Sequence, residues 1–228
     1  MKKQSKRLTK AKEAVVPYPV SPEEGIELLK KTATANFIES TEVHIFLNID
    51  PKYSDQQLRA TVILPNGSGK IKKIAVLLPE EKIKEEYRQI ADVVGSIDLI
   101  EKISSGYIDF DVLIASPEMM PNLAKLGKIL GPKGLMPSPK AGTVTNNIED
   151  AIEEFKRGKI EYRADRAGIV RLSFGKVNFS TKELLENLRA VYSSIEQNKP
   201  SGVKGKYFKL LSMCTTMGPL ILVNLNNF

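Results

Sequence analysis

The spacing of apolar residues changes twice along this chain of 228 residues, and that change constrains its fold more than any other feature. Apolar and polar residues alternate from Glu42 to Ile49, which predicts a half-buried strand. From Lys73 to Ala115, short and nearly continuous apolar runs alternate with helical segments instead. This β-α-β-α-β pattern predicts a small parallel sheet covered by helices. Strand-like patterns return at 160–163 and 169–174.

The length suits one large domain or two small ones. Each end of the chain holds only a helix and a few strands, too little for a core of its own. We therefore predict that residues 1–68 and 160–228 form one discontinuous α+β domain, and that residues 69–159 form an inserted three-layer α/β domain.

Two helices are predicted within the split domain. Ser21 and Pro22 mark the start of a helix that apolar spacing extends to Phe37. A strongly amphipathic helix is expected from Thr181 to about Gln197, with Thr181 as its N-cap. In the middle of the chain, Asn147 is expected to cap a helix that runs to Arg157.

Positive charge is concentrated in three segments that contain no acidic residue. Residues 1–12 carry six Lys and Arg, residues 119–148 carry four Lys, and residues 197–228 carry four Lys. The whole chain has a formal net charge of only +7, so the remainder is net acidic. Such segregation favours a protein that offers selected basic surfaces to a polyanion, although a solvated tail with chance clustering gives the same pattern.

The scarcity of His and Cys excludes most catalytic chemistry. His44 and Cys214 are each the only residue of their type, so no internal disulfide can form, and a clustered zinc site of the usual ligands is not expected. A nucleophilic Cys214 would need His44 within hydrogen-bond reach, and nothing in the sequence brings the two together. We predict no metal, no cofactor, no small-molecule substrate and no enzyme activity. No apolar stretch is long enough to predict a membrane span.

Three loops have compositions that could serve binding. Residues 66–70 contain Gly-Ser-Gly-Lys but lack the earlier Gly and the following Ser or Thr of a phosphate-binding loop. Residues 131–143 combine three glycines, three prolines and two lysines; they either present donors to phosphates or form a structured connection. Residues 214–219 (Cys-Thr-Thr-Met-Gly-Pro) suit close packing against a sugar-phosphate surface, or simply join two strands.

The stretch Leu130–Val144 (LGPKGLMPSPKAGTV) resembles the signature of the ribosomal protein L1 family. Further matches are Thr41–His44 (TEVH), Leu64–Gly67 (LPNG) and Thr215–Pro219 (TTMGP). They occur in the family's order and cover nearly the whole chain.

The resemblance implies a large-subunit stalk protein of bacterial or plastid type. Its first domain would be built from both chain ends and bind large-subunit ribosomal RNA, and its second would be a Rossmann-like insertion. The implied roles are to form the mobile stalk near the E site, to assist release of deacylated tRNA, and to repress translation of the protein's own mRNA. The implied location is the bacterial cytoplasm or the plastid stroma, on the ribosome.

The resemblance also implies an RNA surface. Asn36 and Ala167 depart from the residues that many members carry there, Lys and Thr. Lys133 and Lys140 in the second domain would contact tRNA or stalk surroundings. The matching RNA-binding residues are Phe37, Glu42, His44, Asp165, Arg166, Gly168, Thr215, Thr216, Met217 and Gly218.

Two alternatives to the ribosomal hypothesis remain. One is a nucleotide-binding enzyme that uses the middle α/β domain, although the sequence lacks a phosphate loop. The other is a free regulator that binds messenger RNA only.

Overall fold

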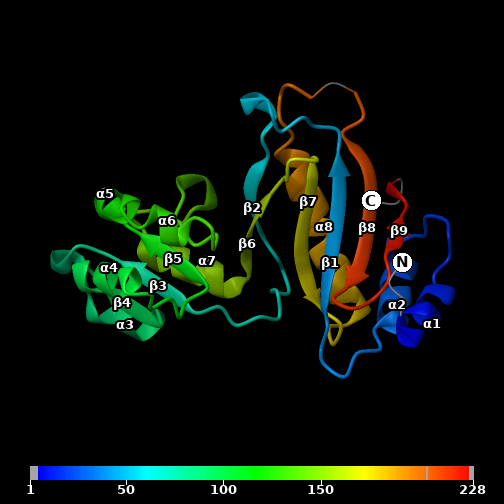
Figure 1. Ribbon diagram of the computed structural model, residues 1–228, viewed down its shortest axis with the longest axis horizontal. Helices are drawn as coiled ribbons and strands as arrows, with labels where there is room; N and C mark the ends of the chain where they lie inside the picture. Colours follow the sequence, from blue (N-terminus) through cyan, green and yellow to red (C-terminus); the bar gives the residue numbers. More distant parts are fainter. Residues whose placement is uncertain (1–4, 204, 226–228) are drawn as a thin grey trace. The chain divides into compact units, whose positions relative to one another are not determined.

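The computed structural model describes residues 5–203 and 205–225. Lys2, Lys3 and Lys204 of the basic segments lie outside this range. The chain divides into two compact units: unit 1 is drawn from Met1–Gly69 and Ile160–Phe228, and unit 2 is Lys70–Lys159 (Figure 1). The predicted mixture of α and β structure is confirmed.

Unit 1 is built on a four-stranded antiparallel sheet of order β7-β1-β8-β9. A separate two-stranded sheet pairs β2 with β6. The elements of this unit are α1 (Lys6–Glu13), α2 (Pro22–Thr32), β1 (Ser40–Leu47), the 3₁₀ turn η1 (Ser54–Gln56), β2 (Arg59–Ile63), β6 (Lys159–Arg163), β7 (Ile169–Lys176), α8 (Thr181–Gln197), β8 (Phe208–Thr215) and β9 (Ile221–Val223).

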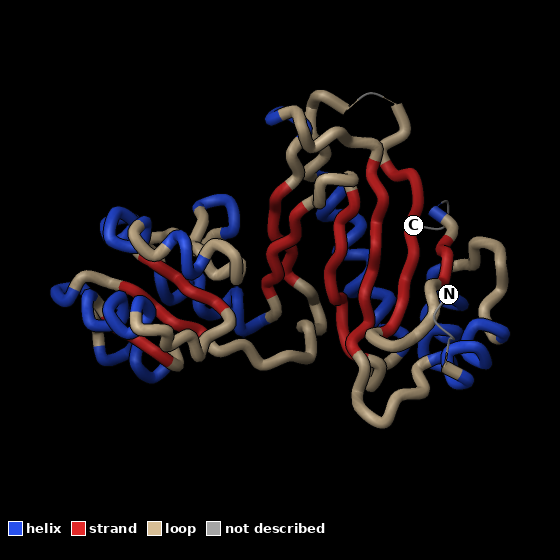
Figure 2. Tube along the Cα trace, viewed as in Figure 1, coloured by secondary structure: helices blue, strands red, loops and turns tan. Residues whose placement is uncertain are grey.

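The core of unit 1 lies between one face of the large sheet and helices α2 and α8. Val43, Ile45 and Leu47 of β1 are completely buried there, and the residues between them are only half-buried. They pack against a stripe on α8 that includes Leu188 and Val191. Figures 1 and 2 show both helices on the same side of the sheet. The opposite face therefore carries the polar residues of the alternating pattern.

Helix α2 begins with the predicted N-cap, whereas helix α8 begins with a different one. Ser21 caps α2, and its hydroxyl and the carboxylate of Glu24 exchange hydrogen bonds with each other's backbone N–H. The prediction that Thr181 caps α8 was wrong. Ser180 has the extended backbone of an N-cap and pairs with Glu183 in the same way, so Thr181 is already helical. Asn147 occupies the N-cap position of its helix, but its side chain makes no capping bond.

Unit 2 is a three-layer arrangement around a parallel sheet of order β4-β3-β5. All four residues of the central strand β3 are completely buried, as its apolar run predicts. Ala75 and Leu77 face one cluster of helical side chains, and Ile74 and Val76 face another. The elements are β3 (Ile74–Leu77), η2 (Glu80–Lys82), α3 (Glu85–Ile90), β4 (Val93–Gly95), α4 (Ile97–Ser104), β5 (Val112–Ala115), η3 (Pro117–Met119), α5 (Met120–Ala124), α6 (Gly127–Leu130), η4 (Pro139–Ala141) and α7 (Ile148–Arg157).

Two helical segments of unit 2 consist of several short pieces. The segment from Glu80 forms η2 and then α3, and the segment from Pro117 forms η3, α5 and α6. Pro121 lacks a backbone N–H donor and lies within the second segment, which accords with its division. None of the described helices has the length and apolar character that crossing a membrane requires.

A buried amide side chain connects the parts of unit 1. Asn187 on α8 is completely buried. Its Oδ1 accepts a hydrogen bond from the Asn66 N–H at 3.0 Å, and its Nδ2 donates to the carbonyls of Gly67 and Phe174 at 3.0 and 2.8 Å. One side chain thus satisfies three backbone groups, on the segment after β2 and on β7.

We expect Asn187→Ala to lower the free energy of unfolding by about 2–3 kcal/mol, because buried backbone groups lose their partners. Urea unfolding followed by far-ultraviolet circular dichroism measures the change. The control is Arg189→Ala, an exposed position on the same helix, which should cost less than about 0.5 kcal/mol. Equal losses for the two variants would contradict the assigned role.

Candidate nucleic-acid interface

The face of the unit 1 sheet opposite α2 and α8 is covered by no helix among the described residues. Glu42, His44 and Phe46 of β1 point to this face, because they alternate with the buried residues of the same strand. Arg171 of β7 lies opposite His44 on one side, and Ser212 of β8 lies opposite it on the other. We call this surface the open sheet face.

One end of the open sheet face is formed by two segments that are far apart in sequence. The turn 215–218 follows β8, and the segment 33–39 precedes β1 (Figure 1). The Thr216 hydroxyl accepts a hydrogen bond from the Ser40 N–H at 3.1 Å, and the Thr216 N–H donates to the Ser40 carbonyl at 3.1 Å. Phe37 and Met217 on these segments are 55% and 50% exposed. The structure thus joins two of the predicted RNA-binding groups.

Phe37 does not end a helix, contrary to prediction. Helix α2 stops at Thr32, and Phe37 stands in the loop that follows. The Ala35 N–H donates to the Glu39 carboxylate at 3.1 Å rather than to a helical carbonyl. This side-chain acceptor offers the backbone an alternative to the helix, and the loop leaves the aromatic ring exposed.

Glu39 organises this end of the sheet and was missed by the sequence analysis. Its side chain is almost completely buried, at 1% exposure. One carboxylate oxygen accepts from the Ala35 N–H, and the other accepts from the Met217 N–H at 2.8 Å. Burial opposes its charge, but hydrogen bonds from the Met217 and Ala35 N–H groups, with the nearby charge of Arg7, together hold its pKa below the ordinary value. Nothing in the sequence distinguishes Glu39 from a surface carboxylate.

Arg7 adds the N-terminal helix to the same assembly. A solvated tail was one interpretation of the basic N-terminal segment, but Lys6–Glu13 forms helix α1, and Ser5 caps it. Arg7 donates one hydrogen bond to the Thr34 hydroxyl and another to the Met217 carbonyl, each at 3.0 Å. A cationic side chain therefore lies directly beside the turn 215–218.

Gly218 is required by packing within this turn. A Cβ on Gly218 would collide with the Thr215 side chain, and the Gly218 N–H donates to the Thr215 carbonyl at 3.1 Å. Residues 214–219 were expected to suit close packing against a sugar-phosphate surface, but the packing of the turn itself already requires this glycine.

The loop around Asp165, Arg166 and Gly168 lies at the other end of the sheet. The Leu47 N–H donates to the Gly168 carbonyl at 3.0 Å, at the end of β1 opposite Ser40. At about 3.3 Å per residue, the two ends of β1 are about 23 Å apart. The loop 165–168 therefore lies far from the turn 215–218, and the RNA-binding residues implied by the resemblance form an extended strip along β1.

The loop 165–168 has a defined conformation of its own. Asp165 Oδ1 accepts from the N–H groups of Ala167 and Ile169, and its Oδ2 pairs with Arg171 at 2.6 Å. These hydrogen bonds, with the charge of Arg171 and against a smaller burial effect, lower the pKa of Asp165. Gly168 has a φ of +76° and packs against the carbonyls of Leu47 and Ile49. Arg166 remains exposed at the tip of the loop.

The structure also corrects the expectation about His44 and Cys214. Pairing of β1 with β8 places Cys214 opposite Glu42, and the Cys214 Sγ lies 3.8 Å from His44 Nε2. Burial and the charge of Glu42 raise the pKa of the Cys214 thiol. This is the opposite of the shift that activates a nucleophile, so the pair does not support covalent catalysis.

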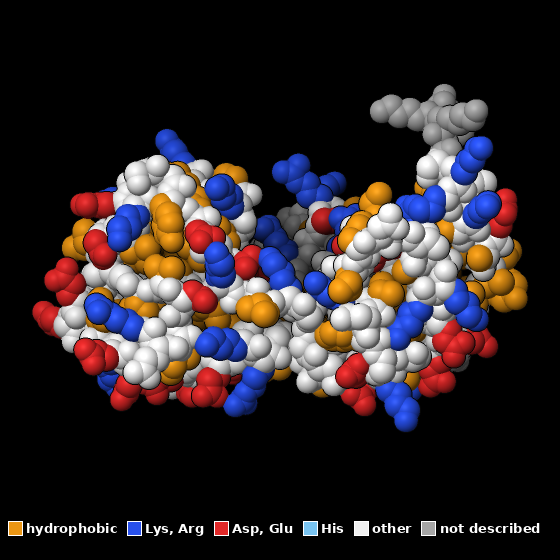
Figure 3. Space-filling model, turned by 90° about the horizontal axis from the view of Figure 1, so that it is seen from below, with side chains coloured by type: hydrophobic (Ala, Val, Ile, Leu, Met, Phe, Trp, Pro, Cys, Tyr) orange, Lys and Arg blue, Asp and Glu red, His pale blue; other side chains and the backbone are white. Residues whose placement is uncertain are grey.

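The basic loop 131–143 belongs to unit 2 and has a structured conformation. The Thr143 hydroxyl accepts from the Ser138 N–H at 2.8 Å, and Pro139–Ala141 forms a 3₁₀ turn. Lys133 and Lys140 are exposed. On the face of unit 2 visible in Figure 3, basic and acidic side chains are interspersed.

The segments that follow β3 and β5 in unit 2 do not favour binding of a nucleotide phosphate. In open α/β sheets, phosphates bind beyond the carboxyl ends of the strands. Here β3 is followed by Leu78 and then by Pro79, Glu80 and Glu81, and β5 is followed by Ser116, Pro117 and Glu118. These carboxylates would repel a phosphate, and neither segment contains a glycine.

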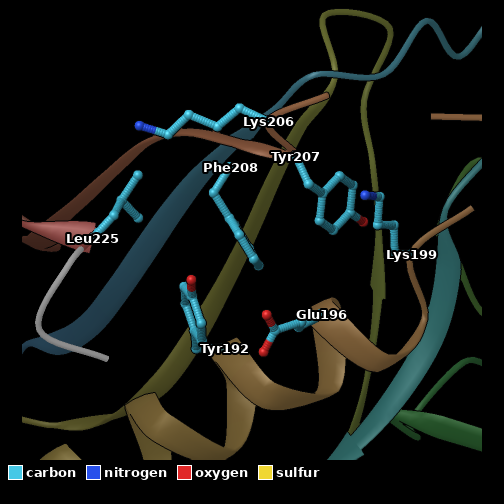
Figure 4. Close-up of a pocket in the computed structure, with 7 residues that line it drawn as sticks. All are labelled: Tyr192, Glu196, Lys199, Lys206, Tyr207, Phe208 and Leu225. Atoms are coloured by element: carbon cyan, nitrogen blue, oxygen red, sulfur yellow. The ribbon is translucent and has the colours of Figure 1, made fainter. Parts of the chain in front are cut away.

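A cavity of about 270 Å³ lies in unit 1 at the end of α8 and the start of β8 (Figure 4). Tyr192 and Phe208 stack on each other there, with ring centroids 4.3 Å apart, and Lys199 lies over the Tyr207 ring. The aromatic surfaces are thus already occupied by protein groups. The remaining lining residues are Glu196, Lys206 and Leu225.

We expect Glu39→Gln to destabilise unit 1 at neutral pH, because the charge-assisted hydrogen bonds weaken. The lowered pKa means that the carboxylate stabilises the fold above the ordinary pKa of 4.5, and that this contribution is lost as the pH falls through the lower folded value. Urea unfolding of both proteins at several pH values measures the difference. A difference in stability that grows as the pH falls below 4.5 would contradict the assignment.

Comparison with known proteins identifies the family. Residues 29–219 match the ribosomal protein L1p/L10e family. The chain is 55% identical over 228 residues to the large ribosomal subunit protein uL1c of Guillardia theta, covering 100% of this chain and 97% of that protein. It is 55% identical over 226 residues to uL1 of Thermosynechococcus vestitus, covering 99% and 95%. It is 61% identical over 206 residues to uL1c of Trieres chinensis, covering 90% of each. The chain therefore belongs to the ribosomal protein L1 family.

Proposed function

We propose that this protein is a structural constituent of the large ribosomal subunit and that unit 1 binds large-subunit ribosomal RNA. Family membership supports this proposal for the whole chain. The observation that carries the RNA site is the joining of residues 33–40 to the turn 215–218: the Glu39 carboxylate accepts from the Met217 N–H, and the Thr216 hydroxyl accepts from the Ser40 N–H. The proposed function is structural and not enzymatic.

The proposed RNA surface is the strip along the open sheet face of unit 1. At one end, Phe37 and Met217 offer exposed apolar side chains to sugars or unstacked bases, with the Arg7 guanidinium beside them. At the other end, Arg166 is available to phosphates. Between them, Glu42 and His44 lie half-exposed on β1 and can read hydroxyl or base groups. Recognition by shape and 2′-hydroxyl contacts suits such a mixed surface.

The finer roles extend the same proposal. The bound RNA would be the mobile stalk near the E site, and Lys133 and Lys140 on unit 2 would face tRNA or stalk surroundings during release of deacylated tRNA. A related structure on the protein's own mRNA would allow repression of translation. The proposed location is on ribosomes of the plastid stroma or the bacterial cytoplasm, in agreement with the relatives named above.

We expect Met217→Glu to lower the affinity for a stalk-like fragment of large-subunit RNA at least tenfold, because it places a charge of the wrong sign at the centre of the joined segments. Electrophoretic mobility shift or filter binding at fixed salt measures the affinity. Lys182→Glu is the control, because it makes an even larger charge change at an exposed position on α8, away from the open sheet face. Equal affinity of the Met217→Glu variant and the wild type would show that the site is misplaced.

We expect the double variant Lys133→Glu, Lys140→Glu to bind the isolated stalk RNA as tightly as the wild type, because both residues belong to unit 2. Ribosomes reconstituted with this variant should release deacylated tRNA from the E site at a changed rate. A large loss of affinity for the isolated RNA would instead place the basic loop in the primary RNA site.

Sedimentation separates a ribosomal protein from a free regulator. Tagged protein in a cell extract should migrate with large ribosomal subunits in a sucrose gradient and remain there after a moderate salt wash. A chain found only in the soluble fractions would contradict the ribosomal assignment and favour binding to messenger RNA alone.

A further inference from the structure

Three side chains with metal-binding atoms converge on the open sheet face. They are Glu42 and His44 of β1 and Cys214 of β8. The Cys214 Sγ lies 3.8 Å from His44 Nε2, and His44 Nε2 lies 3.6 Å from Glu42 Oε2. All three ligand atoms lie within 4.8 Å of one another. His44 and Cys214 are the only His and the only Cys of the chain.

The backbone holds this cluster in place. Glu42 and His44 are two residues apart on the same strand, so both side chains point to one face. Cys214 lies directly opposite Glu42 in the antiparallel pairing of β1 with β8. All three residues are half-buried. The ligands therefore come from the central strands of a sheet, where their spacing is fixed by backbone hydrogen bonds.

The distances fit a zinc ion. Zinc binds sulfur at about 2.3 Å and nitrogen or oxygen at about 2.0–2.2 Å, so ligand atoms of a tetrahedral site are about 3.4–3.6 Å apart. The 3.6 Å between His44 Nε2 and Glu42 Oε2 lies at the upper end of this range, and the 3.8 Å between His44 Nε2 and Cys214 Sγ lies slightly above it. The Glu42 side chain is 42% exposed, so its carboxylate has room to approach the sulfur.

The ligand types select the class of metal. Thiolate and imidazole favour zinc and similar transition metals over magnesium and calcium, which prefer sets of oxygen ligands. Zinc binds the thiolate rather than the thiol, so metal binding competes with protons for the ligand atoms and weakens as the pH falls.

We propose that Glu42, His44 and Cys214 form a zinc-binding site on the open sheet face of unit 1. The three side chains supply three ligands, and the fourth coordination position faces solvent. Such a three-ligand set with an open position is a geometry that zinc adopts in proteins.

Cobalt titration of the reduced, metal-free full-length protein tests the site, because a cobalt–thiolate bond gives a near-ultraviolet charge-transfer band. We expect a saturable band that zinc abolishes by displacing cobalt. Cys214→Ser should lose the band, and His44→Gln and Glu42→Gln should each weaken cobalt binding by at least about tenfold. Ser212→Ala is the matched control, since this residue lies opposite His44 on the same face and is not a proposed ligand; it should keep the band and the affinity.

Several results would overturn the site. One is the absence of a charge-transfer band in the wild type up to millimolar cobalt. Another is zinc affinity that calorimetry finds unchanged in Cys214→Ser. A third is a band in His44→Gln as strong and as tightly held as in the wild type, which would mean that cobalt binds the thiol with other partners.

A consequence of the site rests on the proposed function. Glu42 and His44 belong to the proposed RNA strip, so zinc and RNA would compete for the same side chains, and each would lower the affinity for the other. Stalk-RNA binding should weaken in the presence of zinc for the wild type and not for Cys214→Ser. Equal zinc sensitivity of the two proteins would overturn the competition. RNA binding measured without zinc, and cobalt binding measured without RNA, keep failure of the RNA proposal separate from failure of the metal site.

Discussion

Strand β1 is the element on which the rest of unit 1 depends. It pairs with β7 on one side and β8 on the other, so residues 40–47 contact segments that follow them by more than 120 positions in the sequence. Its buried positions form the centre of the core, and its outward positions form the centre of the open sheet face. Forming such a long-range pairing costs loop-closure entropy, because the intervening chain must be closed into a loop before the strands can make contacts. The compact inserted unit 2 spans most of the gap.

The ends of the sheet are fixed by polar groups rather than by apolar packing. The Glu39 carboxylate accepts hydrogen bonds from the backbone N–H groups of Ala35 and Met217, which lie far apart in the sequence. Arg7 of helix α1 joins the same network by donating to the Met217 carbonyl. A buried charge is tolerated only when such donors replace water. The same bonds hold together the two segments that carry the exposed side chains of Phe37 and Met217. Stability and the shape of the proposed RNA surface therefore come from one network.

The open sheet face illustrates why residue counts alone do not decide chemistry. One His and one Cys in 228 residues make a metal or catalytic site improbable from composition. The pairing of β1 with β8 nevertheless brings both residues together beside Glu42. The high pKa of the thiol argues against nucleophilic catalysis, whereas the spacing of the three ligand atoms suits zinc.

The sequence by itself determined the features that depend on local periodicity and composition. These are the alternating strand β1, the fully buried strand β3, the capped helix α2 and the basic loop 131–143. It also indicated the family, because a continuous motif needs no folding to be recognised. Tertiary structure alone decided where α2 ends, since Glu39 diverts the backbone of Ala35, and that α1 forms beside the turn 215–218. Only the tertiary structure shows that the length of β1 separates the loop 165–168 from that turn. Only the pairing of β1 with β8 brings the side chains of His44 and Cys214 close together. The reason is physical: hydrophobic spacing reports which face of an element is buried, but the partner of a polar group depends on strand pairing across the whole chain.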